Sequence, residues 1–594
     1  MGRALMGWGK FRRLLVLGIV LSSYSLAQIQ NQPDDGQWPM AAKNYASTRY
    51  STLDQINTGN VKALKLDWTF STGVERGHEA APLVVNNTMY VVTPWPNLLY
   101  ALDLTKPGAP VKWMYQPNPA RASQGVACCD VVNRGAAYYN GKIYYNTLDV
   151  QTVAVDANTG KEVWKTKLGD IRKGESITMA PIVAKGKVLV GSSGGEFGVR
   201  GWMAGLDADT GKIAWRAYST GPDREVLIGP NFKPFYASER GADLGMKTWQ
   251  GEQWKVGGGN PWGWVSYDPQ LDLIYYGTSN PGPWNADMRP GDNKWTSALF
   301  ARRPETGEAI WAYQIYPHDE HDYDAVNENV LLDLPIQGRM RKVLAHPDRD
   351  GRLYIIDRAT GEVLSAEAFG FVNTSAYVDL KTGRIKIVDA KTTGFKTTRD
   401  ICPAAAGAKD WQPSAFSPKT GLLYIPHNNL CMEFQGTQAN YIAGTPYVGA
   451  NVKMYAGPGG NRGGFMAWDP VTAKPVWKVK ENFPAWSGAV VTAGNVVFYG
   501  TMDGWFKALD ARNGNLLWQF KAGSGIVGQP VVYKGPDGKE YVAVLSGVGG
   551  WAGAVVAGGI NTVDGTAALG FTNAMTDLGK YTTKGGMLYV FALP

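Results

Sequence analysis

The repeat that runs through this chain is clearest in the stretch Val153-Ala154-Val155-Asp156-Ala157-Asn158-Thr159-Gly160-Lys161-Glu162-Val163-Trp164. It consists of a short apolar run, an Asp, a turn that ends in Gly, and a second run that ends in Trp. Asp and Thr-Gly are turn residues, and Gly supplies the positive φ angle that many tight turns need. Alternating apolar residues on both sides are typical of strands. Each copy is therefore predicted to form a β-hairpin that ends in a Trp.

The copies recur at a regular interval. Clear ones lie at residues 206–215, 304–311 and 509–518, and looser ones at 102–113, 356–364 and 468–477. Trp164 follows Trp113 by 51 residues, and Trp518 follows Trp477 by 41. A period of about 40–50 residues is typical of β-propellers, which have four short strands per blade. We count seven or eight units and predict an all-β, eight-bladed β-propeller with a Trp wedged between neighbouring blades. Residues 587–592 are expected to close the ring with N-terminal sequence.

The first 27 residues have the pattern of an export signal. Basic residues precede a short apolar core at 14–21, and Ser25-Leu26-Ala27 provides small residues for cleavage. The core is too short to cross a bilayer comfortably, so we expect cleavage near Ala27 rather than an uncleaved membrane anchor. We therefore predict a periplasmic protein without stable membrane insertion. Residues 28–594 are predicted to form a single propeller domain.

The charge of the chain is mildly basic. The formal net charge is +8, and residues 1–27 carry four bases and no acids, which leaves +4 for the mature chain. No basic run with interleaved aromatic residues is present, so the sequence gives no reason to expect nucleic acid as a partner. A small positive charge is compatible with docking of an acidic protein.

The chain contains four cysteines. An even number in an exported chain favours disulfides, and Cys402 and Cys431 can close a loop. Cys128 and Cys129 are adjacent, so they pair either with each other in a strained eight-membered ring or elsewhere. The sequence contains no Cys-x-x-Cys-His motif, so we expect no covalently attached c-type haem.

The most acidic stretch of the chain is Pro317-His318-Asp319-Glu320-His321-Asp322-Tyr323-Asp324. If it is extended, Asp322 and Asp324 project from the same face. Two carboxylates so close repel each other, and a hard cation with oxygen ligands would remove that penalty. The alternatives are a solvated acidic loop and a transition-metal site at His318 and His321.

Three motifs resemble those of the pyrroloquinoline-quinone (PQQ) alcohol dehydrogenases, specifically the large subunit of methanol dehydrogenase. They are GVACCDVVNRG at 125–135, the stretch 284–295, and the acidic stretch 317–324. The resemblance extends from Trp38 to Pro594. Within the family, a second aspartate at Asp324 resembles the lanthanide-dependent (XoxF-type) branch, whereas the calcium branch usually has a small residue there.

The resemblance implies a metal site and a catalytic base. The protein ligands of the ion would be Glu196, Asn280, Asp322 and Asp324. The expected ion is a lanthanide of the La, Ce, Nd or Eu class, with Ca²⁺ as the alternative, because three carboxylates suit a trivalent ion better than a divalent one. Asp322 would also be the base that removes the hydroxyl proton of the alcohol.

The resemblance also implies a PQQ site. Trp262 would lie under the quinone plane, and a Cys128–Cys129 disulfide ring would cover its other face. Residues in contact with the edge of the cofactor would be Glu79, Arg134, Thr178, Ser193, Gly194, Gly195, Arg349, Trp486 and Trp551. Two positions depart from the family pattern. His321 stands where the family usually has Trp, which affects the site mouth, and Asp410 stands where the calcium enzymes have Asn, which makes its cofactor contact less certain.

The implied function is oxidation of methanol and other short primary alcohols to the aldehyde, by hydride transfer to PQQ. A soluble c-type cytochrome would then accept the electrons, and the family often forms homodimers. The alternatives are a calcium-dependent enzyme of the same fold and a non-enzymatic propeller scaffold of envelope assembly.

Overall fold

The computed structural model describes residues 1–2, 36–564 and 567–594. The predicted export signal, residues 1–27, lies outside these residues except for Met1 and Gly2. No helix in the described part of the chain is both long and apolar enough to cross a membrane.

Eight sheets of four or five strands contain most of the strands in the described residues. Each is formed almost entirely by strands that follow one another in sequence, as the hairpin repeat predicts. The first four consist of β3 (Leu83–Val85), β4 (Thr88–Val92), β5 (Leu99–Asp103) and β6 (Val111–Tyr115); β7 (Ala136–Tyr139), β8 (Lys142–Thr147), β9 (Gln151–Asp156) and β10 (Glu162–Lys167); β11 (Ile182–Ala184), β12 (Lys187–Gly191), β13 (Trp202–Asp207) and β14 (Ile213–Tyr218); and β15 (Val265–Asp268), β16 (Leu273–Gly277), β17 (Ala298–Arg302) and β18 (Ala309–Gln314).

The next three sheets include one with a strand from the N-terminal region. They consist of β19 (Val330–Ile336), β20 (Arg339–Pro347), β21 (Arg352–Asp357) and β22 (Val363–Ala368); β26 (Ala415–Ser417), β27 (Leu422–Asn428), β30 (Gly463–Asp469) and β31 (Lys474–Glu481); and β1 (Tyr50–Ser51) with β32 (Val490–Thr492), β33 (Val496–Gly500), β34 (Trp505–Asp510) and β35 (Leu516–Lys521).

The eighth sheet joins the two ends of the chain. It contains β36 (Val531–Lys534), β37 (Glu540–Ser546), β38 (Met587–Ala592) and the early strand β2 (Lys65–Ser71). β2 runs antiparallel to β38, and Thr69 pairs with Tyr589. This confirms the prediction that residues 587–592 pair with N-terminal sequence.

Tryptophans connect successive repeats. The indole N–H of Trp164 donates to the Ala208 carbonyl at 3.0 Å, and that of Trp311 donates to Arg358 at 3.1 Å. The Trp164 ring also covers Gly211, the Gly of the next turn, which has a φ of 71°. A Cβ atom there would lie 2.6 Å from the ring, so both the φ angle and the close approach require Gly.

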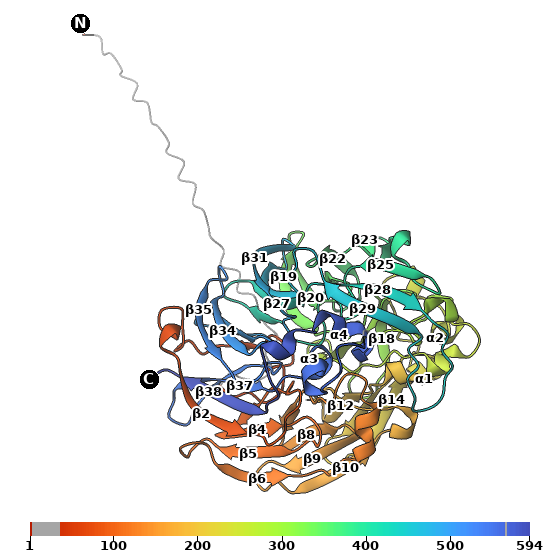
Figure 1. Cartoon of the computed structure of the whole chain (residues 1–594). Coiled ribbons are helices and arrows are strands. Elements are labelled where there is room, and N and C mark those ends of the chain that lie inside the picture. Colours follow the sequence, from red (N-terminus) through yellow and green to blue (C-terminus); the bar gives the residue numbers. More distant parts are fainter. Residues whose placement is uncertain (3–35, 565–566) are drawn as a thin grey trace.

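Figure 1 shows the sheets arranged around a central region, with two short helices, α3 (Gly550–Ala557) and α4 (Phe571–Ala574), in front of it. Helices α1 (Asp223–Val226) and α2 (Leu244–Lys247) lie in the long insertion between β14 and β15. The insertion after β22 adds two small sheets, β23 (Ser375–Asp379) with β24 (Arg384–Ile387), and β25 (Thr397–Ile401) with β28 (Leu430–Gly436) and β29 (Ala450–Ala456).

Candidate active site

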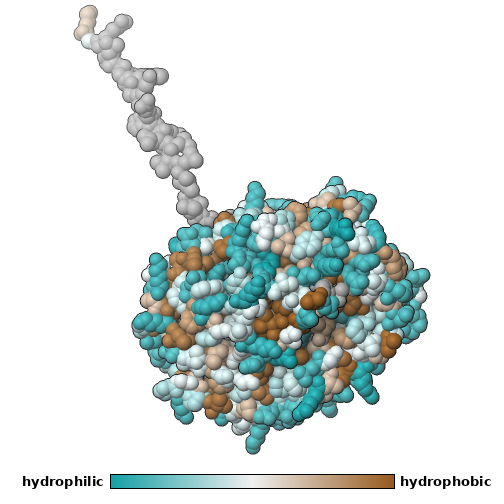
Figure 2. Space-filling view, in the orientation of Figure 1, coloured by the Kyte–Doolittle hydropathy of each residue, from teal (hydrophilic) through white to brown (hydrophobic). Residues whose placement is uncertain are grey.

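A pocket brings together residues from widely separated parts of the sequence. Fifteen of the seventeen predicted metal and cofactor residues line it: Glu79, Cys128, Cys129, Arg134, Thr178, Ser193, Gly194, Glu196, Trp262, Asp322, Asp324, Arg349, Asp410, Trp486 and Trp551. The other two are adjacent to lining residues: Gly195 precedes Glu196 in the chain, and the Asn280 backbone N–H donates to Asp324. On the face seen in Figure 2, apolar residues gather near the centre, over the helices that cover this region.

The acidic stretch places both of its predicted ligands in the pocket wall. Asp322 and Asp324 are 3% and 2% exposed, so the solvated-loop alternative is wrong for these two residues. Asp324 accepts two hydrogen bonds, from the Asn280 backbone N–H at 2.5 Å and from the Trp262 indole at 2.8 Å. Hydrogen bonds therefore connect the acidic stretch to Trp262 in the pocket wall and to the backbone of Asn280.

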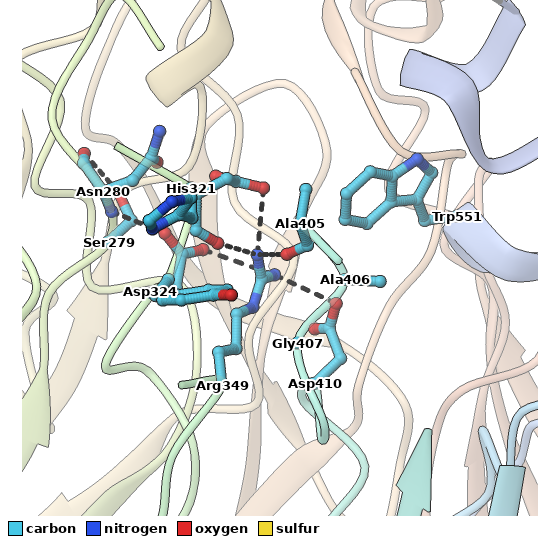
Figure 3. Close-up of polar contacts among 12 residues, drawn as sticks. Ser279, Asn280, His321, Asp324, Arg349, Ala405, Ala406, Gly407, Asp410 and Trp551 are labelled. Atoms are coloured by element: carbon cyan, nitrogen blue, oxygen red, sulfur yellow. Dashed lines mark hydrogen bonds and ion pairs between the residues drawn. The ribbon is translucent and has the colours of Figure 1, made fainter. Parts of the chain in front are cut away.

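Arg349 lies among three carboxylates (Figure 3). Its guanidinium nitrogens are 3.1 Å from Asp322 Oδ2, 3.4 Å from Asp324 Oδ2 and 3.0 Å from Asp410 Oδ2. It also donates to the Ala405 carbonyl at 3.3 Å. Arg349 thus supplies a positive charge that offsets the repulsion among these buried acids.

Burial dominates the acidity of these groups. It raises the pKa of Asp324 to about 7, an effect that Arg349 opposes and Glu196 reinforces. The pKa of Asp322 is raised well above its ordinary range, again first by burial. Although burial lowers the pKa of Arg349, the three surrounding carboxylates raise it above its ordinary value. A cation beside these carboxylates would favour their ionised form.

Two oxygen atoms have the properties of open ligand positions. Asn280 Oδ1 and Asp322 Oδ1 are buried and have no hydrogen-bond partner in the described residues. Amide and carboxylate oxygens are the ligands that hard cations prefer. Within the described ranges, no three His, Cys, Asp or Glu side chains are by themselves grouped as a metal site. The oxygen donors of Glu196, Asn280, Asp322 and Asp324 therefore have the chemistry that a hard cation needs. Arg349 contacts two of these residues, Asp322 and Asp324.

The pocket has a second buried ion pair. Arg134 Nε lies 3.0 Å from Glu79 Oε2, and another nitrogen donates to Thr178 Oγ1 at 2.7 Å. The guanidinium also lies over the rings of Trp262 and Trp411, 4.7 and 5.0 Å from their centroids. Burial raises the pKa of Glu79 to about 8 against the opposing effect of Arg134. This part of the pocket therefore presents a flat aromatic surface next to a cation, which suits a planar anion.

The cysteine predictions have different outcomes. Cys402 and Cys431 form a disulfide, as predicted from the residues. Cys128 and Cys129 line the pocket, but both are free thiols, so the predicted ring between them is absent from this structure. Adjacent residues across a trans peptide have Cα atoms about 3.8 Å apart, which is below the usual range of about 4.4–6.8 Å for a disulfide.

His321 does not lie at the site mouth. It is fully buried, and its ring nitrogens contact the Tyr316 hydroxyl at 3.2 Å and the Lys391 carbonyl at 2.9 Å. His318 contacts a different carbonyl, that of Gly291, at 2.7 Å. Because each ring is held by its own partners, this pair gives no support to a transition-metal site.

Seven lining residues were not predicted: Ala127, Asp130, Val132, Ser176, Trp284, Trp411 and Leu569. Some had a sequence signal. Asp130 lies inside the adjacent-cysteine motif, Trp284 opens the stretch 284–295, and Trp411 follows Asp410. Leu569 had none, because its position depends on the packing of the segment between α3 and α4.

The comparisons with known proteins agree with this geometry. A sequence model of the PQQ glucose/ethanol/alcohol dehydrogenase beta-propeller domain matches residues 38–368 and 464–542. The chain belongs to this PQQ dehydrogenase family. The matched ranges include most of the pocket residues, and Asp410, Trp411, Trp551 and Leu569 lie outside them.

Relatives of this dehydrogenase align over nearly its whole length. It is 54% identical to a lanthanide-dependent methanol dehydrogenase of Methylacidiphilum fumariolicum, over 97% of this chain and 95% of that protein. A lanthanide-dependent methanol dehydrogenase of Methylorubrum extorquens is 48% identical over 98% of this chain and 99% of that one. A solved structure of a europium-containing methanol dehydrogenase superposes with a TM-score of 0.93 at 55% identity, covering 94% of this chain and 98% of the other.

Proposed function

We propose that this dehydrogenase oxidises methanol, and other short primary alcohols, with PQQ and a lanthanide ion as cofactors. The observation that carries the proposal is a pair of buried oxygens, Asn280 Oδ1 and Asp322 Oδ1, that have no hydrogen-bond partner among the described residues and lie beside the additional carboxylate of Asp324. A divalent ion needs fewer anionic ligands than a trivalent one, so three carboxylates favour the lanthanide. The names of the two 48–54% identical relatives support the same assignment.

The residues of the chain have distinct roles in this proposal. Glu196, Asn280, Asp322 and Asp324 hold the ion, and Trp262 and Arg134 receive the quinone and its carboxylates. PQQ, when bound, accepts the hydride, and the ion acts as a Lewis acid. Asp322 takes the hydroxyl proton of the alcohol on its carboxylate, which Arg349 holds in place through Oδ2 at 3.1 Å. Because Asp322 and Asp324 are both buried, water is excluded from this proton transfer.

The proposed base is tested with Asp322→Asn. The variant keeps the shape of the side chain but has no basic oxygen, so kcat for methanol should fall about 10²–10⁴-fold. PQQ absorbance of the purified protein should stay near that of the wild type. Asp357→Asn, at the partly exposed end of β21, serves as a control with unchanged kcat. A variant Asp322→Asn with full turnover would exclude this residue as the base.

The metal assignment is tested by growth with and without a light lanthanide. Protein made with the lanthanide should contain about one ion per chain by elemental analysis and should turn over methanol, whereas protein made with calcium alone should have much lower activity. Equal activity with calcium would instead identify a calcium-dependent enzyme. The absence of both PQQ and metal would favour a non-enzymatic scaffold.

We further propose that the eight sheets are eight blades of one closed ring, in which the Trp–carbonyl hydrogen bonds join neighbouring blades.

A soluble c-type cytochrome accepts the electrons, since the sequence has no haem motif. The rate of electron transfer to this cytochrome should fall as the salt concentration rises. Periplasmic location and a homodimer rest on the export signal and the family resemblance. Cell fractionation and light scattering test them.

A further inference from the structure

The backbone around Glu196 is rich in glycine. Glu196 lies in the 3₁₀ turn Gly195–Phe197, between Gly194 with a φ of 115° and Gly198 with a φ of 69°. The hydrogen bonds within this segment are local, from Phe197 and Val199 to Gly194 and from Gly198 to Gly195. Glycine is conformationally permissive, so these residues do not fix the direction of the Glu196 side chain by themselves.

A distant loop holds this turn. The backbone N–H of Tyr447 donates to the Glu196 carbonyl at 2.6 Å. Tyr447 belongs to residues 437–449, which connect β28 to β29 in the insertion; we refer to them as the insertion loop. Its rings also cover the turn, because a Cβ atom on Gly198 would lie 2.7 Å from Tyr441 and 3.1 Å from Tyr447. Tyr447 is 6% exposed, so the contact is shielded from water.

The same loop holds a second part of the pocket wall. The Val448 carbonyl accepts the backbone N–H of Trp284 at 2.7 Å, and the Thr437 carbonyl accepts the Asn285 side chain at 3.1 Å. The ends of the loop are joined by the Thr437 N–H and the Gly449 carbonyl at 2.8 Å. Two adjacent residues, Tyr447 and Val448, thus connect a predicted metal ligand to an aromatic wall of the pocket.

The base of the loop is anchored next to the acidic stretch. Cys431 of β28 forms the disulfide with Cys402, and the Leu430 carbonyl accepts the Ala404 N–H at 2.9 Å. The Tyr323 hydroxyl donates to the Pro403 carbonyl at 2.5 Å, immediately after Cys402. Tyr323 stands between Asp322 and Asp324. The insertion therefore contacts the proposed metal site from two sides, at Glu196 and at the acidic stretch.

We propose that the insertion loop positions the metal site, and that the Tyr447 N–H orients Glu196 toward the lanthanide ion. Tyr447 is a positioning residue in this proposal, since it acts through Glu196. The inference rests on the proposed ligand role of Glu196. Partners that orient ligands change metal affinity by about 10–100-fold when they are removed.

The test compares two substitutions at the same position. Tyr447→Pro removes the N–H and the ring, whereas Tyr447→Ala removes only the ring. PQQ-loaded, metal-free protein is titrated with Tb³⁺, and Trp-sensitised terbium luminescence gives Kd. We expect Kd to rise at least 10-fold more in Tyr447→Pro than in Tyr447→Ala. Ala443→Pro, at an exposed position of the same loop, is the control for proline itself and should leave Kd near the wild-type value.

Equal Kd values for the two Tyr447 variants would overturn the proposal. Should Tyr447→Pro fail to fold by circular dichroism, hydrogen exchange on the PQQ-loaded wild type decides. Terbium should slow exchange in the insertion loop and leave the hairpin of β23 and β24 unchanged, and an unchanged insertion loop would overturn the proposal. Failure of the wild type to bind terbium would instead overturn the proposed metal function itself.

Discussion

Arg349 and Asp322 form a buried ion pair with a nitrogen–oxygen distance of 3.1 Å, and both side chains are almost completely shielded from solvent. The same guanidinium contacts Asp324 and Asp410. One positive charge therefore faces three carboxylates, a balance that a bound trivalent ion would change.

Arg349→Met should destabilise the metal-free protein more than the lanthanide-loaded protein. Breaking a buried pair by removing one partner costs about 3–5 kcal/mol, because the remaining charges are uncompensated. A bound ion supplies part of the missing charge, so the loss should be smaller after loading. Thermal unfolding with and without lanthanide measures the loss of stability in both states. Arg341→Met, at a partly exposed ion pair with Asp357 and Glu362, should cost about 1 kcal/mol or less in both states. An equal loss from Arg349→Met in both states would contradict this account.

Asp324→Ala should distinguish between the two candidate ions, a lanthanide and Ca²⁺. The substitution deletes one carboxylate and its charge, and leaves Asp322 in place. Affinity for a trivalent ion should fall more than affinity for Ca²⁺, because the higher charge depends more on anionic ligands. Lanthanide-dependent turnover should collapse while thermal stability remains high, since the sheets do not depend on this residue. Titration with Tb³⁺ and with Ca²⁺ measures the difference. Full lanthanide-dependent turnover in the variant would show that the metal assignment is wrong.

Gly211→Ala should destabilise the contact between neighbouring sheets. A Cβ atom there would lie 2.6 Å from the Trp164 ring, and overpacking of this kind costs about 1–3 kcal/mol. Gly186→Ala is the matched control: its φ is 70° against 71° at Gly211, but nothing lies within 4 Å of the new Cβ atom. Both variants carry the same cost of a positive φ, so the difference in urea midpoint isolates the clash. Equal midpoints would mean that the ring moves aside freely.

Protonation of His78 should contribute to acid unfolding. Burial lowers its pKa to about 4, whereas the unfolded chain has a value of about 6.5. Between these values the unfolded state binds the proton more strongly, so stability is present above pH 6.5 and is lost as pH falls toward 4. The loss approaches about 3 kcal/mol.

His78→Gln removes this titration, so the difference in unfolding free energy between pH 7 and pH 4.5 should shrink by about 2–3 kcal/mol. Urea unfolding at both pH values measures it. An unchanged difference in His78→Gln would assign the acid sensitivity to other groups.

The predictable part of the fold is local in sequence. The turn of the repeat stabilises itself, since Asp156 accepts hydrogen bonds from the N–H and hydroxyl of Thr159 at 2.8 and 2.9 Å. Such short-range chemistry is visible without a structure. The sequence predicted that residues 587–592 pair with N-terminal sequence, whereas the partner strand β2 and the pairing of Thr69 with Tyr589 are known only from the structure.

The site was predictable as a set of residues and not as a set of contacts. The motifs named Arg349 as a cofactor contact, but its ion pairs with three acids depend on how separate loops converge. The Tyr447 contact with Glu196 joins residues 251 positions apart through backbone atoms, and backbone atoms carry no sequence signature. The adjacency of Cys128 and Cys129 is visible in the sequence, but it leaves open whether they pair with each other or elsewhere, and both are free thiols in this structure.

The pairing of β2 with β38 has a consequence for the order of events during synthesis. Thr69 finds its partner Tyr589 only after almost the whole chain has been made, so this sheet is incomplete on any shorter chain. Contacts this distant in sequence form slowly, because loop closure precedes any gain from pairing. A chain exported as residues 1–27 predict would therefore cross the membrane with this sheet unfinished. The eighth sheet would be completed only after its last strand, β38, had crossed.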